Sequence, residues 1–284
     1  MKKRIKSDSG FMGLTHSTSA LAVFLVILAF FPTLVLNHTD DNLWILIMAC
    51  VTVIGAALMP DFDNTKSTAI STFGILGIAI SAIVRSLNIV IRNSIKGKYD
   101  DNSLDPHRGF SHTLISGVLV TIGIFALTSI NINIPVPFID REFTLGFIFA
   151  SIIFAMCTKL AIASILHKQY KKFIKMIPLC NLGLYIISIG FAILVLAQLP
   201  DGASYRWLGL AVGLGWIIHI IGDAFTVAGV PLFFPFAKRG KRWWVYRIPP
   251  GIRAGGLIED AVFIPIFTIA AVLALIKIIT NFIL

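Results

Sequence analysis

The chain has few charged residues and few cysteines for its length. Only 13% of its 284 residues are charged, whereas 57% are hydrophobic, and the mean hydropathy is +0.88. This composition excludes an ordinary soluble domain, in which about 25% of the residues are charged. Apolar runs of the length that crosses a membrane, about 20 residues, recur along nearly the whole sequence. They indicate a polytopic membrane protein.

The three cysteines, Cys50, Cys157 and Cys180, lie inside or at the edge of apolar segments and lack CxxC or CxxxC spacing. Cysteines of this kind are usually small buried hydrophobic residues, so the sequence argues against a disulfide framework and a cysteine-based zinc site. The net charge of +10 does not indicate nucleic-acid binding. Its basic residues gather in short loops between apolar segments, as the positive-inside rule describes.

We expect an all-α, polytopic membrane helix bundle with about seven transmembrane helices, forming one membrane-embedded domain over residues 1–284. Segment 71–95 carries Arg85 and Arg92 seven residues apart on one helical face, which favours a helix in the membrane interface. Segment 225–236 is interrupted by glycine and proline and is expected to be re-entrant or interfacial. The expected spans cover residues 20–36, 43–59, 113–130, 143–166, 178–199, 207–223 and 259–282.

Lysine and arginine gather in four segments, which the positive-inside rule places on the cytoplasmic side. Seven spans satisfy this rule for every basic segment and put the N-terminal segment 1–19 in the cytoplasm. We therefore expect a multi-pass protein of a bacterial or archaeal plasma membrane, with residues 143–199 as an additional helical pair. The basic segments are 2–6, 85–108, 168–175 and 238–253.

Four short polar islands contain histidine or aspartate and lie where expected spans begin or end. The topology derived from lysine and arginine brings all four to the cytoplasmic face. Ionisable side chains at membrane depth cost roughly 3 kcal/mol each, so such a cluster predicts a shared function, and metal binding is the simplest one. The islands are Thr15-His16-Ser17, Pro60-Asp61-Phe62-Asp63, the segment 107–112, and His219 with Asp223.

The islands combine imidazole nitrogens with carboxylate oxygens, a donor set that suits zinc, manganese or ferrous iron. His219 and Asp223 are four residues apart and share one face of a helix. Structural alternatives exist for each island: a histidine bonded to a neighbouring carboxylate, a capping aspartate at Asp63, a helix cap at Ser111, or a solvated loop. The expected ligands exceed the needs of one ion and are His16, Asp61, Asp63, His107, His112, His219 and Asp223.

In this order the motifs resemble the YdjM-type family of membrane-bound, metal-dependent hydrolases. The resemblance covers roughly residues 13–236, and His107-Arg108-Gly109-Phe110-Ser111-His112 is its most specific part. That family is itself distantly similar to the zinc-dependent phospholipase C and P1 nuclease group, which implies phosphoester hydrolysis. The chain departs from the compact family core by the additional apolar segments of 143–199.

The resemblance implies a hydrolase in which a metal-activated water attacks a phosphoester or phospholipid-like substrate. We expect Arg108 to bind the developing negative charge and Asp61, Asp63 or Asp223 to act as general base. The competing functions are a divalent-metal transporter and a non-catalytic metal-binding protein. Transport requires polar residues near the bilayer midplane, whereas stretches such as 118–127 are apolar.

The expected partners are membrane lipids and a lipid or phosphoester substrate. Two further features of the sequence concern the site and the membrane surface. Glu259 opens the last expected span, as an additional ligand or as a helix cap. The segment 238–244 alternates basic residues with Trp243 and Trp244 and is expected to anchor the protein at the headgroup level.

Overall fold

The computed structural model describes residues 13–36, 42–100, 108–135, 143–176, 178–199, 204–253 and 256–283. Its long elements are all helices, which confirms the expected all-α class. Within the described ranges, the two short strands β1 (Asn133–Ile134) and β2 (Phe143–Thr144) form an antiparallel pair. The helices are α1 (Gly13–Phe30), α2 (Asn42–Ala56), α3 (Thr68–Phe73), α4 (Ile75–Ser94), α5 (Leu114–Leu127), α6 (Leu145–Met176), α7 (Pro178–Leu196), α8 (Trp207–Ala224) and α9 (Ile264–Ile278), with the short helices η1 (Pro32–Leu34), η2 (Pro60–Asp63), η3 (Phe110–His112), η4 (Glu259–Phe263) and η5 (Ile279–Ile283).

Six helical segments of the described chain are long and apolar enough to cross a membrane. Five of them overlap expected spans, and the sixth is α4, which the sequence placed in the membrane interface. The expected spans over 113–130 and 178–199 form α5 and α7, whose described apolar stretches are shorter than a full span. The six segments are Gly13–Phe30, Leu43–Asp63, Ile75–Ser94, Leu145–Leu166, Trp207–Ala224 and Glu259–Asn281.

Two helix boundaries differ from the expectation. Helix α1 already includes Gly13, so His16 lies inside its first turns and not before the span. Helix α6 continues to Met176 and so includes the expected basic loop 168–175. Lysine has a good helix propensity, so a basic run does not by itself end a helix. The new helix begins only at Pro178, in the first helical position, which proline favours.

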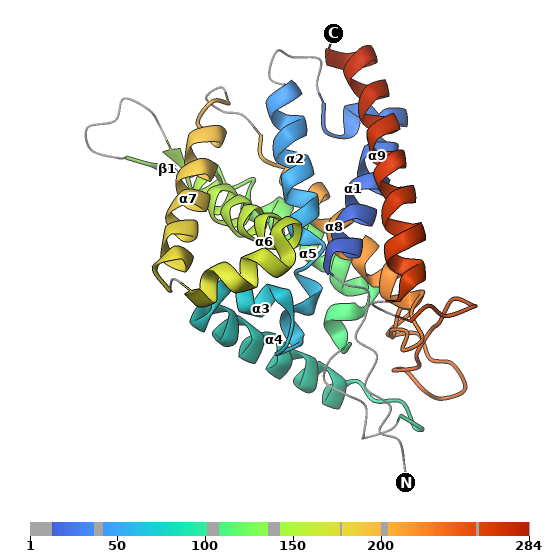
Figure 1. The fold of residues 1–284 in the computed structure, drawn as a ribbon. Helices are drawn as coiled ribbons and strands as arrows, with labels where there is room; N and C mark the ends of the chain where they lie inside the picture. Colours follow the sequence, from blue (N-terminus) through green and yellow to red (C-terminus); the bar gives the residue numbers. More distant parts are fainter. Residues whose placement is uncertain are drawn as a thin grey trace.

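The core lies where α1 packs against α2, α8 and α9, and α2 against α6 (Figure 1). Phe24 of α1, Met48 of α2 and Leu208 of α8 are fully buried there. Gly55 lets the backbones of α2 and α6 touch, because a Cβ at this position would lie 2.0 Å from the Cys157 carbonyl oxygen. Such small residues allow close helix packing where the hydrophobic effect between helices is weak.

Helix α4 lies across the lower side of the molecule in Figure 1 and packs against α3, η2 and η3. Its inward row contains the buried residues Gly77, Ser81 and Asn88. Its outward row is apolar and includes Ile83 and Leu87, which are 62% and 54% exposed. Helix α4 therefore turns its polar side to the protein and its apolar side outward, the reverse of an amphipathic helix in a soluble protein.

The segment after α8, which the sequence predicts to be re-entrant or interfacial, forms turns and isolated bridges. Val230 and Tyr246 exchange two backbone hydrogen bonds of 3.1 and 2.8 Å. Trp243 stacks on Phe234 with ring centroids 4.0 Å apart. The prolines of this segment explain the absence of a helix, because proline removes a backbone donor and clashes with the preceding turn.

Candidate metal centre

Four elements bring the polar islands to one place at the ends of the helices. His16 comes from α1, the two aspartates from η2, His112 from η3, and His219 with Asp223 from the last two turns of α8. His107 lies outside the described residues, so its position stays a prediction. The structure brings together the other six expected ligands, which are His16, Asp61, Asp63, His112, His219 and Asp223.

The protonation of His219 follows from its backbone partner. Its Nδ1 lies 2.7 Å from the carbonyl oxygen of Ala57. Helix α2 ends at Ala56, so the carbonyl groups near this end need partners from elsewhere in the fold. A carbonyl only accepts hydrogen bonds, so Nδ1 carries the proton and Nε2 presents its lone pair to the cluster.

His112 is oriented in the same way by a carboxylate. Its Nδ1 lies 3.2 Å from Oδ2 of Asp63. That oxygen also accepts hydrogen bonds from the Ser111 hydroxyl at 2.5 Å and from the backbone N–H of Arg108 at 3.1 Å. An ionised carboxylate surrounded by donors accepts the Nδ1 proton of His112, which turns Nε2 toward the cluster as the candidate ligand atom. Asp63 thus lies behind the imidazole and fixes its tautomer.

Asn88 of α4 completes this support. Its Nδ2 donates to Asp63 at 3.3 Å and to the Ser111 hydroxyl at 3.1 Å, while its Oδ1 accepts from the backbone N–H of Ser111 at 3.1 Å. Gly109 allows this approach, because a Cβ there would lie 3.0 Å from the Asn88 side chain. The sequence analysis missed Asn88. The row of small and polar residues at positions 77, 81 and 88, which shares one side of the helix, is the signal that points to it.

The two candidate ligand nitrogens face each other. Nε2 of His112 and Nε2 of His219 are 3.3 Å apart. Asp61 Oδ1 lies 3.8 and 3.7 Å from these nitrogens, and Asp223 Oδ2 lies 3.6 and 3.9 Å from them. Ligand atoms about 2.0–2.2 Å from a tetrahedral metal are about 3.3–3.6 Å apart. The donor spacing is therefore close to that of a zinc-type site.

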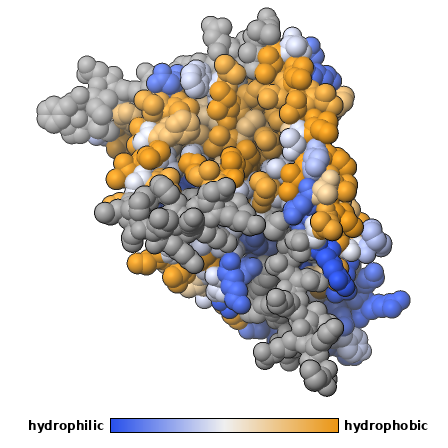
Figure 2. All heavy atoms as spheres, in the orientation of Figure 1, coloured by the Kyte–Doolittle hydropathy of each residue, from blue (hydrophilic) through white to orange (hydrophobic). Residues whose placement is uncertain are grey.

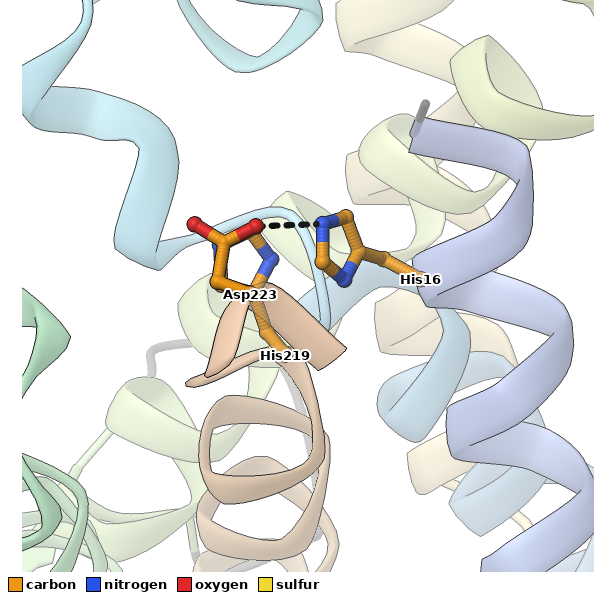
Figure 3. A group of neighbouring side chains, drawn as sticks. All are labelled: His16, His219 and Asp223. Carbon is orange, nitrogen blue, oxygen red and sulfur yellow. Dashed lines mark ion pairs between the residues drawn. The ribbon is translucent and has the colours of Figure 1, made fainter. Parts of the chain in front are cut away.

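His16 and the second oxygen of Asp223 extend the cluster. Figure 3 shows the Asp223 carboxylate turned toward His16, and His16 Nε2 lies 3.4 Å from Asp223 Oδ1. The rings of His16 and His219 are stacked with centroids 3.8 Å apart. Two groups can therefore hold a metal ion, His16 with His219 and Asp223, and Asp61 with His112 and His219. They share His219, whose single available nitrogen can serve only one ion.

The cluster is buried and negatively charged. His16, His112 and His219 are fully buried, and Asp63 and Asp223 are nearly so. The Asp61 side chain is 22% exposed, so solvent reaches the cluster beside this carboxylate. Burial disfavours the charged form of His112, but Asp63, Asp223 and Asp61 outweigh it and raise the pKa of this imidazole. The field of the carboxylates thus favours a cation.

Arg108 balances part of this charge. Its Nη2 lies 3.3 Å from Asp223 Oδ2, and its Nη1 donates to the Gly229 carbonyl at 2.9 Å and to the Thr226 hydroxyl at 3.3 Å. Its backbone adopts a left-handed conformation with φ of 67°, which is rare for arginine and common near functional sites. Arg108 therefore ties Asp223 to the segment after α8. Binding of a substrate oxyanion by this side chain stays a prediction.

One structural alternative for the segment 107–112 is a helix cap at Ser111. Thr113, not Ser111, caps α5, because its hydroxyl accepts the backbone N–H of Ser116 at 3.2 Å. Ser111 instead donates to Asp63. Glu259 is fully buried at the start of η4, and it does not belong to either candidate metal group of the described residues.

Fold and site together define an all-α protein whose helices are long enough to span a membrane and whose helix ends enclose a buried histidine–aspartate cluster. The model of the family described as YdjM inner membrane protein matches residues 11–282, and the chain belongs to this family. This result confirms the family indicated by the sequence motifs. Searches of curated proteins and of solved structures found no match.

Proposed function

We propose that the protein is a membrane-bound, metal-dependent hydrolase that acts on a phosphoester or phospholipid-like substrate. The observation that carries the proposal is the pair of facing Nε2 atoms of His112 and His219, 3.3 Å apart. Both Nδ1 atoms are engaged by acceptors, so both Nε2 atoms point at the same space. Two nitrogens at this distance share either a proton or a cation, and the carboxylates of Asp61 and Asp223 beside them suit a divalent cation.

The donors fit a divalent ion of borderline hardness, with zinc as the first candidate and manganese or iron as alternatives. Asp223 presents Oδ1 to His16 and Oδ2 to His112 and His219, which suits a carboxylate shared by two ions. When bound, such an ion supplies Lewis-acid chemistry and lowers the pKa of water toward 7.

The residues around the candidate ligands have separate proposed roles. Asp61 is the partly exposed carboxylate of the cluster and lies within 3.8 Å of both Nε2 atoms, so it is the best placed general base for water entering the site. Asp63 and Asn88 hold His112 in position. Arg108 holds Asp223 and closes the side of the cluster that faces Gly229.

The position of the cluster favours an amphipathic substrate. It lies at helix ends, beside helix α4 with its outward apolar row. A phosphoester with an apolar tail could place the tail along α4 while its headgroup approaches Asp61. A transporter would instead need polar residues that continue through the bundle.

The test is metal content and turnover of the detergent-purified full chain. Elemental analysis is combined with hydrolysis of bis(p-nitrophenyl) phosphate and of a fluorogenic phospholipid. His219→Ala removes a nitrogen shared by both candidate metal groups. Asp260→Asn, at an exposed carboxylate, is the matched control.

We expect stoichiometric metal and turnover in wild type and in the control, and loss of both in His219→Ala. Bound metal without turnover on either substrate would refute the hydrolase and favour transport or a scaffold role. Absence of metal from wild type would refute the shared metal site.

A further inference from the structure

A second surface carries a charge pattern that the metal centre does not use. We call residues 225–253 the basic lobe. The sequence of the lobe contains no Asp or Glu. Its basic side chains are all exposed, and they are Lys238, Arg239, Lys241, Arg242, Arg247 and Arg253.

The lobe is attached to helix α4. The Trp243 indole donates to the carbonyl oxygen of Ile95, just after α4, at 2.8 Å. The backbone N–H of Tyr99 donates to the Gly240 carbonyl at 3.2 Å. Asp100 accepts hydrogen bonds from the backbone N–H groups of Arg242 and Trp243 at 3.3 and 3.1 Å. These contacts place the lobe beside the exposed Lys96 and Lys98 that follow α4.

Apolar and aromatic side chains accompany these cations. Phe236 is 75% exposed, and the Trp244 indole donates to its carbonyl oxygen at 2.9 Å. Lys238 Nζ lies 4.8 Å from the centre of the Trp244 ring. Figure 2 shows hydrophilic residues gathered at the lower right, where Figure 1 places the segment after α8, and hydrophobic residues over most of the remaining coloured surface.

We propose that the basic lobe and the outward face of α4 together bind anionic phospholipid headgroups. Four to eight cations beside an amphipathic helix match the charge of such a surface. The exposed apolar row of α4 and Phe236 would lie among acyl chains while the cations meet phosphate groups. The positive-inside rule explains on which side of a membrane cations lie. It does not explain why they fold onto one face beside an exposed apolar helix.

This surface also adjoins the metal centre. Arg108, which contacts Asp223, donates to the carbonyl oxygen of Gly229 within the lobe. The proposal nevertheless stands independently of the hydrolase proposal, because it concerns lipid retained by the lobe and not turnover.

The experiment counts lipids retained by the purified full chain. Protein in mild detergent is equilibrated with equimolar phosphatidylglycerol and phosphatidylcholine, and native mass spectrometry measures their ratio on the protein. The variant Lys241→Gln/Arg242→Gln removes two lobe cations whose described hydrogen bonds are made by backbone atoms. The matched control is Arg206→Gln/Lys277→Gln, one arginine and one lysine exposed outside the lobe.

We expect wild type and control to prefer phosphatidylglycerol equally. In the lobe variant, the ratio of bound phosphatidylglycerol to bound phosphatidylcholine should fall about fivefold for each cation removed. An unchanged ratio in the lobe variant, or an equal loss in the control, would overturn the proposal. The proposal would also be overturned if a single-stranded oligonucleotide, added in competition, displaced phosphatidylglycerol from the wild-type protein. The pair Arg247→Gln/Arg253→Gln repeats the test at other lobe cations, and an unchanged midpoint of thermal unfolding in detergent verifies that each variant is folded.

Discussion

The substitution Asp63→Asn tests whether the metal centre depends on a residue that orients a ligand. Asp63 Oδ2 accepts the Ser111 hydroxyl and the Arg108 backbone N–H, and it lies 3.2 Å from His112 Nδ1. Asparagine keeps the shape but removes the charge. An amide that turns its NH2 toward Nδ1 would stabilise the other tautomer of His112, with the proton on Nε2.

Loss of such an orienting partner typically weakens metal affinity by about 10- to 100-fold. We therefore expect the Kd of Asp63→Asn for zinc to rise by about this factor, which corresponds to about 1.4–2.7 kcal/mol. Removal of a ligand atom in His112→Ala should weaken binding further. The assay is competition with a chromophoric zinc chelator, using detergent-purified protein at pH 7.5.

Asp260→Asn makes the same chemical change at an exposed carboxylate and should leave the Kd unchanged. A wild-type Kd in Asp63→Asn would refute the orienting role of Asp63. A loss as large as that of His112→Ala would instead indicate that Asp63 is itself a ligand, as the sequence motif suggested.

Three further predictions concern stability in detergent, measured by thermal unfolding. Gly55→Ala should destabilise the protein by about 1–3 kcal/mol, because the new Cβ would meet a backbone carbonyl of α6. The control Gly123→Ala, whose Cβ would have no atom within 4 Å, should be neutral or slightly stabilising. Equal effects of the two substitutions would contradict the close packing of α2 and α6. Asn181→Ala should lower the free energy of unfolding by about 1–3 kcal/mol, because Asn181 Oδ1 accepts a hydrogen bond of 2.8 Å from the buried Lys159 Nζ. The loss of stability should be smaller in a Lys159→Met background. An unchanged loss would show that the two side chains are not coupled. Zinc at 100 times its Kd should stabilise wild type by about 2.7 kcal/mol and His219→Ala not at all; equal stabilisation would place the ion elsewhere.

The helices were largely predictable because their signal is local. Apolar runs gave most of the membrane-length helices, and the rule that proline and glycine interrupt helices located the segment after α8. The boundary errors at α1 and α6 have the same physical origin. Hydropathy marks where a helix is apolar, whereas a helix continues as long as its backbone hydrogen bonds and side-chain propensities permit. His16 and the basic segment 168–175 are therefore helical although they are not apolar.

The sequence by itself determined the donor types of the candidate metal centre, because histidine and aspartate are recognisable donors wherever they lie. Only the tertiary structure decided which of their atoms face one another. The tautomer of His219 depends on the carbonyl of Ala57, 162 residues away in the chain, and that of His112 depends on Asp63, which Asn88 supports from α4. Backbone carbonyls carry no sequence signature, and an asparagine such as Asn88 acquires its role only when folding places it beside a carboxylate.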